Sequence, residues 1–210
     1  GPDGMFGTRF TRTRFQDCRC IQQTMITLTE DEKSRLSPAL ADPIEYRKSG
    51  LSLNHIIGCP LDCSYCVRHL FGNFEMKAPT ALLSDKEAVR QLTTHRFFVP
   101  HVTPLQLFNR ATDPLLPTVR PHLHAVLQML DAAGYRNHVL IISRFRFEPA
   151  DAERLNRLVN LRVTLLFTYS GIADQSVEPV DSAIAENSLK LAYALAGRYR
   201  VILYWRPLVP

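Results

Sequence analysis

Three cysteines within eight residues, Cys59, Cys63 and Cys66, constrain this chain more than any other feature. They follow an apolar run, residues 51–57, which predicts a strand that ends at Gly58. Thiolates at such short spacing can wrap one small inorganic group, and three of them leave one iron of an iron–sulfur cluster open to a ligand. The sequence therefore predicts a cluster site at the end of the first strand.

Zinc is the alternative that the cysteines alone leave open. Structural zinc takes four ligands, commonly from two CxxC-type pairs, and here His55 or His69 would have to supply the fourth. The asymmetric spacing, with Tyr65 directly before the last cysteine, favours a cluster over zinc. A non-enzymatic zinc-binding module is the hypothesis outside enzyme chemistry.

Composition limits the class of protein. The 210 residues carry a net charge of +5, and 20 of the 25 basic residues are arginines, which suit planar anions and are compatible with a nucleic-acid partner. No apolar run approaches the roughly 18 residues of a membrane span, so no membrane partner is expected. Five cysteines without a secretory signal indicate a reducing compartment, and we expect a cytoplasmic protein.

The chain divides into an N-terminal arm with a short helix, residues 1–50, and a larger domain, residues 51–210. Phenylalanines and arginines alternate irregularly over residues 1–24, which predicts an arm that packs on the domain or touches nucleic acid. Cys18 and Cys20 form a CxC pair that could ligate a second metal. Thr29 and Glu32 stand at the positions of a capping box and predict a helix start.

The larger domain alternates strand and helix with a period of about 30 residues, which is typical of a parallel sheet with right-handed crossovers. Strands are predicted at residues 51–57, 105–109, 138–143, 161–168 and 199–205, and helices at 84–95, 119–133, 148–159 and 181–196. The loops after the strands carry polar residues, and such loops meet at the carboxyl edge of the sheet. We expect an α/β fold, a partial TIM-like barrel that is truncated after its fifth strand.

The motif Cys59-x3-Cys63-x2-Cys66, with Tyr65 before the third cysteine, resembles the signature of the radical S-adenosylmethionine (SAM) superfamily. The resemblance implies a partial (β/α)6 barrel and a [4Fe–4S] cluster whose free iron binds SAM. It also implies reductive cleavage of SAM to a 5′-deoxyadenosyl radical, with electrons from an external donor of flavodoxin or ferredoxin type. That radical would take hydrogen from a substrate that the sequence does not identify.

The same resemblance implies which residues surround SAM. Tyr65 matches the aromatic residue near the adenine. Where the family often has a Gly-Gly-Glu type motif, this chain reads differently, and Asn109, Thr112 and Asp113 are the expected substitutes, with Asp113 able to pair with an ammonium. Arg206, at the end of the last strand, is expected to meet the cofactor or the substrate.

A narrower resemblance is to the spore photoproduct lyase branch. The pattern lies in Ser143-Arg144 after the third strand, residues 168–170 after the fourth, and Val177-Glu178-Pro179 before a long helix. In that branch a basic residue after strand three and a serine after strand four contact the carboxylate and ribose of SAM, and Arg144 and either Thr168 or Ser170 match those positions. The chain departs from the lyase in having no cysteine in residues 104–118 and in having Val67 after the third cysteine. Besides a nucleic-acid repair lyase or modifier, a peptide-modifying radical enzyme therefore stays open.

Overall fold

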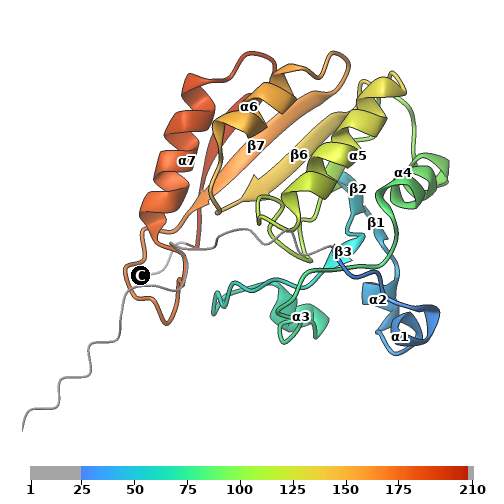
Figure 1. Ribbon diagram of the computed structural model, residues 1–210, viewed down its shortest axis with the longest axis horizontal. Helices are drawn as coiled ribbons and strands as arrows, with labels where there is room; N and C mark the ends of the chain where they lie inside the picture. Colours follow the sequence, from blue (N-terminus) through green and yellow to red (C-terminus); the bar gives the residue numbers. More distant parts are fainter. Residues whose placement is uncertain (1–24, 208–210) are drawn as a thin grey trace, which may run out of the picture.

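Six strands form one sheet in the order β1-β2-β5-β6-β7-β8 in the computed structural model, which describes residues 25–207 (Figure 1). From β2 to β8 all neighbouring strands are parallel, and only β1 is antiparallel to its neighbour. The predicted α/β class with a partial barrel of parallel strands is confirmed. The strands are β1 (Ile44–Arg47), β2 (Gly50–Leu53), β5 (Leu105–Leu107), β6 (His138–Ser143), β7 (Arg162–Tyr169) and β8 (Arg200–Trp205).

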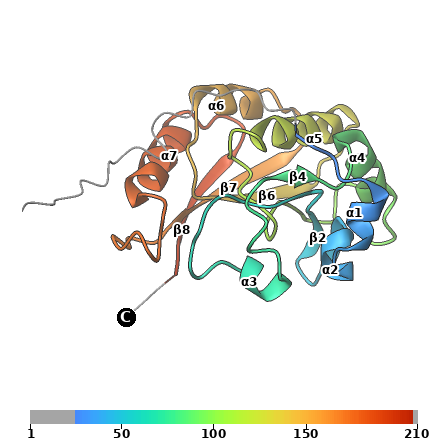
Figure 2. The same ribbon diagram turned by 60° about the horizontal axis from the view of Figure 1, so that its bottom comes forward.

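Four helices cover one face of this sheet, and the segment that carries α3 (Arg68–Phe71) lies on the other side (Figure 2). The core forms between the helices and the sheet, where Ile141 of β6 and Leu130 of the following helix are fully buried. Each of the four helices was predicted, with ends that differ by up to three residues. They are α4 (Asp85–Thr94), α5 (Arg120–Ala132), α6 (Pro149–Asn156) and α7 (Ser182–Ala194).

The first predicted strand is wrong in its extent. It divides into β2, which joins the large sheet, and β3 (Ile56–Ile57), which pairs with β4 (Thr80–Ala81) in a separate two-stranded sheet. The break falls at Asn54 and His55, two polar residues that are buried and therefore need hydrogen-bond partners outside the sheet. His55 bonds Asp85 at 2.8 Å, and this contact turns the chain away from the large sheet.

Strand β1 and two short helices were not predicted. β1 adds an antiparallel edge to the sheet through a tight turn at Gly50. The φ of Gly50 is 123°, and a Cβ there would stand 2.1 Å from the Pro104 carbonyl oxygen, so the turn excludes other residues. Pro38 begins α2 (Pro38–Ala41), because proline is well tolerated in a first helical turn.

The N-terminal part of the described chain contains α1 (Glu30–Ser34), and the predicted capping box of Thr29 and Glu32 is confirmed. β1 belongs to the large sheet although it precedes the division expected at residue 50, and that division stays a prediction. The basic arm, with Cys18 and Cys20, lies outside the described residues. Within residues 25–207, no helix is long and apolar enough to cross a membrane.

Candidate active site

The cysteine loop begins at Gly58 because only glycine fits there. Its φ is 97°, and a Cβ at this position would stand 2.3 Å from the Ala78 carbonyl oxygen. The Gly58 amide donates to the Ala111 carbonyl at 3.1 Å, and the Cys59 amide donates to the Met76 carbonyl at 2.8 Å. The loop is thereby fixed on both sides before the first thiol is reached.

Arg68 holds the same loop closed from within. Its guanidinium is buried and donates to the carbonyl of Leu61 at 2.9 Å, ahead of it in the chain. It also donates to the carbonyls of Asn73, Phe74 and Met76, at 3.1 to 3.2 Å. One side chain thus ties the cysteine segment to the segment that follows it.

Cys59 and Cys63 are buried and Cys66 is half-buried at this loop. Burial raises the pKa of Cys59 to about 11 and that of Cys63 to about 12, because a thiolate is poorly solvated there. Arg144 partly opposes this effect at Cys63. A thiol that binds a metal releases its proton to the solvent, and a buried thiol that is otherwise protonated suits a ligand role better than a nucleophile role.

Cys59, Cys63 and Cys66 line one pocket of about 280 Å³. Among residues 25–207, no three histidine, cysteine or carboxylate side chains stand close enough together to hold a single metal ion. In an iron–sulfur cluster, in contrast, each thiolate binds a different iron atom, so the three sulfur atoms stand farther apart than ligands of one ion do. The two histidines considered as zinc ligands are engaged elsewhere: His55 bonds Asp85, and His69 stacks on Phe74 with ring centroids 3.8 Å apart.

Glu178 is the main residue of the site that the sequence did not single out. Its carboxylate is 4% exposed, bonds Arg144 Nη1 at 2.6 Å, accepts from the Tyr65 hydroxyl, and lies 3.8 Å from Cys63 Sγ. Arg144 also donates to the Tyr65 hydroxyl, and its guanidinium lies 5.1 Å from the centre of the Tyr65 ring. The Val177-Glu178-Pro179 segment before α7 belongs to the resemblance to the lyase branch, which predicts no separate role for Glu178.

Charge and burial compete in this Tyr65–Arg144–Glu178 cluster. Burial is the largest effect on the pKa of Tyr65, and together with the Glu178 carboxylate it raises that pKa against the opposing influence of Arg144. Burial alone would lower the pKa of Arg144, but its interactions with the neighbouring acidic groups, Cys63 and Glu178 first, raise it overall. Arg144 therefore stays cationic and Tyr65 stays protonated beside the cysteines.

Asp113 joins the ends of two strands. Its carboxylate accepts from the Leu115 amide at 2.9 Å, from the Ser143 hydroxyl at 2.7 Å and from the Arg144 amide at 2.9 Å. Burial raises its pKa although these hydrogen bonds act in the opposite direction. The predicted contact of Asp113 with an ammonium stays a prediction, and in the structure this side chain positions Ser143 and Arg144.

Asn109 and Thr112 stand on the same loop in different circumstances. Asn109 accepts from Ser52 and donates to Gln106, both at 2.5 Å, so its amide is fixed between the ends of β2 and β5. The Thr112 hydroxyl is buried without a hydrogen-bond partner among the described residues, although the residue lines the pocket. An unpaired hydroxyl at a pocket wall is ready for a ligand.

Ser170 is the one predicted contact that the pocket does not include. Its hydroxyl lies 3.5 Å from that of Ser182 and accepts from the Ile172 amide, so it shapes the loop that leads to α7. Arg206 lies at the rim, with its guanidinium 4.3 Å from the centre of the Tyr204 ring. The predicted residues that line the pocket are Cys59, Cys63, Tyr65, Cys66, Asn109, Thr112, Asp113, Ser143, Arg144, Thr168 and Arg206.

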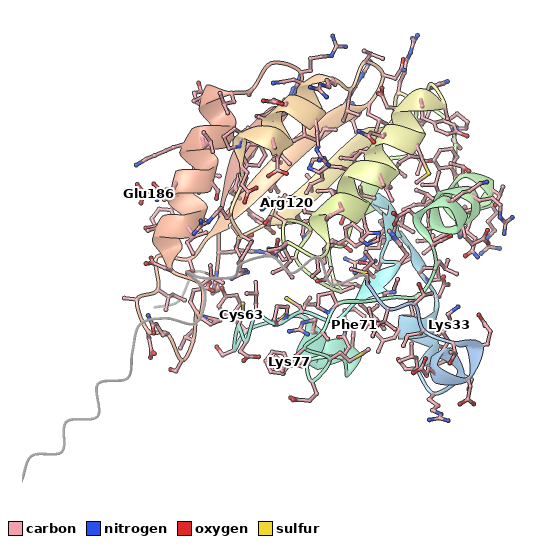
Figure 3. All side chains as sticks on the ribbon, in the orientation of Figure 1. Lys33, Cys63, Phe71, Lys77, Arg120 and Glu186 are labelled. Carbon is pink, nitrogen blue, oxygen red and sulfur yellow. The ribbon has the colours of Figure 1, made fainter. Side chains whose placement is uncertain are left out.

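Figure 3 shows Cys63 at the end of the sheet toward which β6 and β7 point, in the segment that also carries Phe71 and Lys77. No protein-family model matches the chain, and no curated protein matches it in sequence. Solved structures do match. Spore photoproduct lyase complexed with dinucleoside spore photoproduct is similar with a TM-score of 0.57 and 11% identity, over 83% of this chain and 50% of the lyase.

The chain shares the fold of spore photoproduct lyase. A tyrosine-to-phenylalanine mutant of the lyase matches with a TM-score of 0.59 and 13% identity, over 82% of this chain and 50% of the lyase. A cysteine-to-alanine mutant with dinucleoside spore photoproduct gives 0.57 and 10%, over 82% and 49%. The chain thus spans about half the length of the lyase structures that it matches, and the likeness at this identity concerns the fold.

Proposed function

We propose that the chain is a radical SAM enzyme, with a [4Fe–4S] cluster bound by Cys59, Cys63 and Cys66. The observation that carries the proposal is the convergence of these cysteines and the polar strand ends on one pocket, in a fold shared with spore photoproduct lyase. When bound, the cluster and SAM would supply a 5′-deoxyadenosyl radical. The described residues fit this group, because the three cysteines are thiolate donors and no fourth cysteine stands among residues 25–207 to close the cluster.

The protein side of this proposal is positioning and charge. Arg144 offers a guanidinium to the SAM carboxylate, since that group binds carboxylates through two parallel hydrogen bonds. The Thr112 hydroxyl and the Asn109 amide offer polar contacts from the β5 side, and Thr168 offers one from the β7 side. Glu178 fixes Arg144 and Tyr65 relative to Cys63, and so determines which way the guanidinium faces.

The test is anaerobic reconstitution with iron and sulfide, followed by reduction with dithionite in the presence of SAM. We expect a brown protein with about four iron atoms per chain and release of 5′-deoxyadenosine. The triple variant Cys59→Ser, Cys63→Ser, Cys66→Ser should lose both. The double variant Cys18→Ser, Cys20→Ser is the matched control and should keep both.

Three outcomes would overturn the proposal in whole or in part. A colourless protein that holds stoichiometric zinc and refuses iron would indicate the zinc-binding module instead. A verified cluster that releases no 5′-deoxyadenosine would remove the radical step. Iron lost in the Cys18, Cys20 variant would show that the cluster ligands include a cysteine outside the three.

A nucleic-acid substrate is the second candidate, since two of the similar lyase structures hold dinucleoside spore photoproduct. The chain lacks the strand-two cysteine that its resemblance to the lyase implies, so we propose the substrate class and leave the repair reaction aside. Incubation of the reconstituted protein with ultraviolet-irradiated and unirradiated DNA tests this. Transfer of deuterium from labelled DNA into 5′-deoxyadenosine is expected, and transfer only from a peptide substrate would favour a peptide-modifying enzyme.

A further inference from the structure

A second cleft lies at the opposite end of the sheet, where β6, β7 and β8 begin. Its volume is about 630 Å³. Its charged lining is entirely basic, and we call it the arginine cleft after the residues Arg136, His138, Arg162, Arg198 and Arg200. All five are exposed, and nitrogen-tipped side chains project from the end of the molecule farthest from Cys63 (Figure 3).

Strand register brings these charges to one face. His138 is paired with Arg162 and Thr164 with Arg200, so the three basic side chains leave the sheet on the same side. Val163, between Arg162 and Thr164, is buried on the other side. These side chains therefore stand on the face away from the helices. Arg162 lies beside His138 of the neighbouring strand, and Arg200 lies beside Thr164, two residues beyond Arg162 along the strand direction.

The basic residues of the arginine cleft form no ion pair among residues 25–207. Every ion pair in that part of the chain involves other basic residues. The nearby Asp131 directs its carboxylate to the amides of Val159, Asn160 and Leu161. Exposed arginines that gather at one end of the sheet without carboxylate partners attract an anion, and its binding lowers their mutual repulsion.

The cleft is also partly rigid. The guanidinium of Arg198 is held by the carbonyls of Leu158 at 2.7 Å and Val159 at 2.9 Å. Arg162 Nη1 lies 3.4 Å from His138 Nε2. A fixed guanidinium loses less freedom when it binds a phosphate, and guanidinium matches phosphate in geometry better than ammonium does.

We propose that the arginine cleft binds the phosphodiester backbone of a nucleic acid. The charges are spread along three strand starts rather than directed at one point, which suits a chain of phosphates better than a single small anion. The cleft is lined by no phenylalanine, tyrosine or tryptophan for stacking, so we infer binding to the backbone without reading of bases. The inference goes beyond the proposed chemistry, because this binding requires neither a cluster nor SAM.

The experiment is a fluorescence anisotropy titration of the full chain with a labelled single-stranded oligonucleotide of mixed sequence. Four phosphate contacts should give a slope of about −2.8 for log K against log salt. In the double variant Arg162→Gln, Arg200→Gln we expect affinity at 0.1 M salt to fall by about 10-fold or more and the slope to weaken by about 1.4. The double variant Arg35→Gln, Arg90→Gln removes the same charge from exposed arginines of α1 and α4 and should bind as the unchanged protein does.

Three results would overturn the inference. One is equal weakening in both double variants, which would show attraction to net charge alone. Another is no binding of the oligonucleotide by the unchanged protein at low salt. The third is displacement of the oligonucleotide by pyrophosphate or polyglutamate at matched charge concentration. Binding that persists in the Cys59→Ser, Cys63→Ser, Cys66→Ser variant separates this inference from the radical proposal.

Discussion

The two ends of the sheet are alike in one respect, because at each of them a buried aspartate holds a loop, but they differ in how their arginines are paired. At the carboxyl end, Asp113 accepts from Leu115, Ser143 and Arg144, and at the amino end, Asp131 accepts from three consecutive amides. Both residues are 8% exposed. In each case one buried acid fixes a loop beside a strand end.

The pKa values of the two acids nevertheless move in opposite directions. More of the protein surrounds Asp113, so burial outweighs its hydrogen bonds and raises its pKa. At Asp131 burial also raises the pKa, but the amides of Leu161, Val159 and Asn160 outweigh it and the pKa falls. The carboxylate at the carboxyl end, which we call the closed end, thus lies deeper in the protein than the carboxylate at the amino end, which we call the open end, although both residues are equally shielded from solvent.

The arginines at the two ends of the sheet also differ in how far they are exposed. Arg144 is enclosed and paired with Glu178, while Arg162 and Arg200 are exposed and have no carboxylate partner among residues 25–207. A closed site with a paired cation suits chemistry, because field and orientation are fixed there. An open site with unpaired cations suits reversible binding of a polyanion.

The largest effect is expected at Gly58, where the cysteine loop of the closed end requires a backbone conformation that only glycine adopts easily. Gly58→Ala places a Cβ against the Ala78 carbonyl at a positive φ, and strain plus overpacking should lower the free energy of unfolding by about 4 kcal/mol. Urea unfolding measures this, and iron content after reconstitution should fall as well.

Gly72→Ala is the matched control. Gly72 also has a positive φ, 68°, but a Cβ there would meet nothing within 4 Å. The cost should therefore be that of the backbone alone, about 1 kcal/mol. Equal costs at Gly58 and Gly72 would show that the cysteine loop does not need its close approach to Ala78.

The next effect concerns the buried ion pair of the closed end. Glu178→Ala removes the carboxylate that pairs with Arg144 and leaves that cation without a partner. Removal of one partner of a buried pair should lower the free energy of unfolding by about 3 kcal/mol. Urea unfolding again provides the measurement. Glu186→Ala, which breaks an exposed pair with Lys190, is the control and should change stability by less than about 0.5 kcal/mol. If Glu178→Ala lost less stability than Glu186→Ala does, Arg144 would be solvated and not enclosed.

Local patterns in the sequence were enough to predict the carboxyl end in outline. The cysteine spacing, and polar residues such as Asn109 and Arg144 after apolar strands, are signals within a few residues of each other. A parallel sheet then brings these strand ends together without further information. This is why nearly every predicted contact lines one pocket.

The parts that sequence reasoning missed depend on distant partners. Glu178 meets Tyr65 across 113 residues, and no local pattern distinguishes it from other glutamates. The break in the first strand depends on His55 finding Asp85, 30 residues away. The arginine cleft also needs the register of three strands, which composition alone does not give.

A smaller effect is expected at the open end. Asp131→Asn replaces an acceptor with an amide group that faces backbone N–H donors, and should cost about 2 kcal/mol at pH 7. The pKa of Asp131 is lowered in the folded protein, so its contribution is present above its usual pKa near 3.8 and is lost as the pH falls below it. Urea unfolding from pH 7 to pH 3 should show the two proteins converging.

Asp62→Asn, at an exposed pair with Lys77, controls for the change of charge and should alter stability by less than about 0.5 kcal/mol. A difference between Asp131→Asn and the unchanged protein that is constant with pH would mean that the lost interaction is not the ionised carboxylate.

The smallest effect tests a third acid, Asp85, which is the first residue of α4. Asp85 bonds His55 at 2.8 Å and His122 at 2.9 Å. Burial would raise the pKa of Asp85, but these hydrogen bonds lower it to about 2, and the same bond raises the pKa of His122. The stabilisation that the ionised Asp85 contributes is present above its usual pKa of about 3.8. The stabilisation that the protonated His122 contributes is present below its usual pKa of 6.5 and is lost as the pH rises through its raised pKa in the folded protein.

Asp85→Asn should therefore reduce stability most between about pH 4 and pH 6.5, by about 1 kcal/mol more than at pH 9. Urea unfolding at pH 5.5 and pH 9 measures the difference. His138→Gln, in which the lost imidazole neighbours Arg162 rather than a carboxylate, should show no such dependence. Equal losses at both pH values for Asp85→Asn would mean that His122 is neutral in the folded protein throughout, and that the acid at this position acts as a hydrogen-bond acceptor alone.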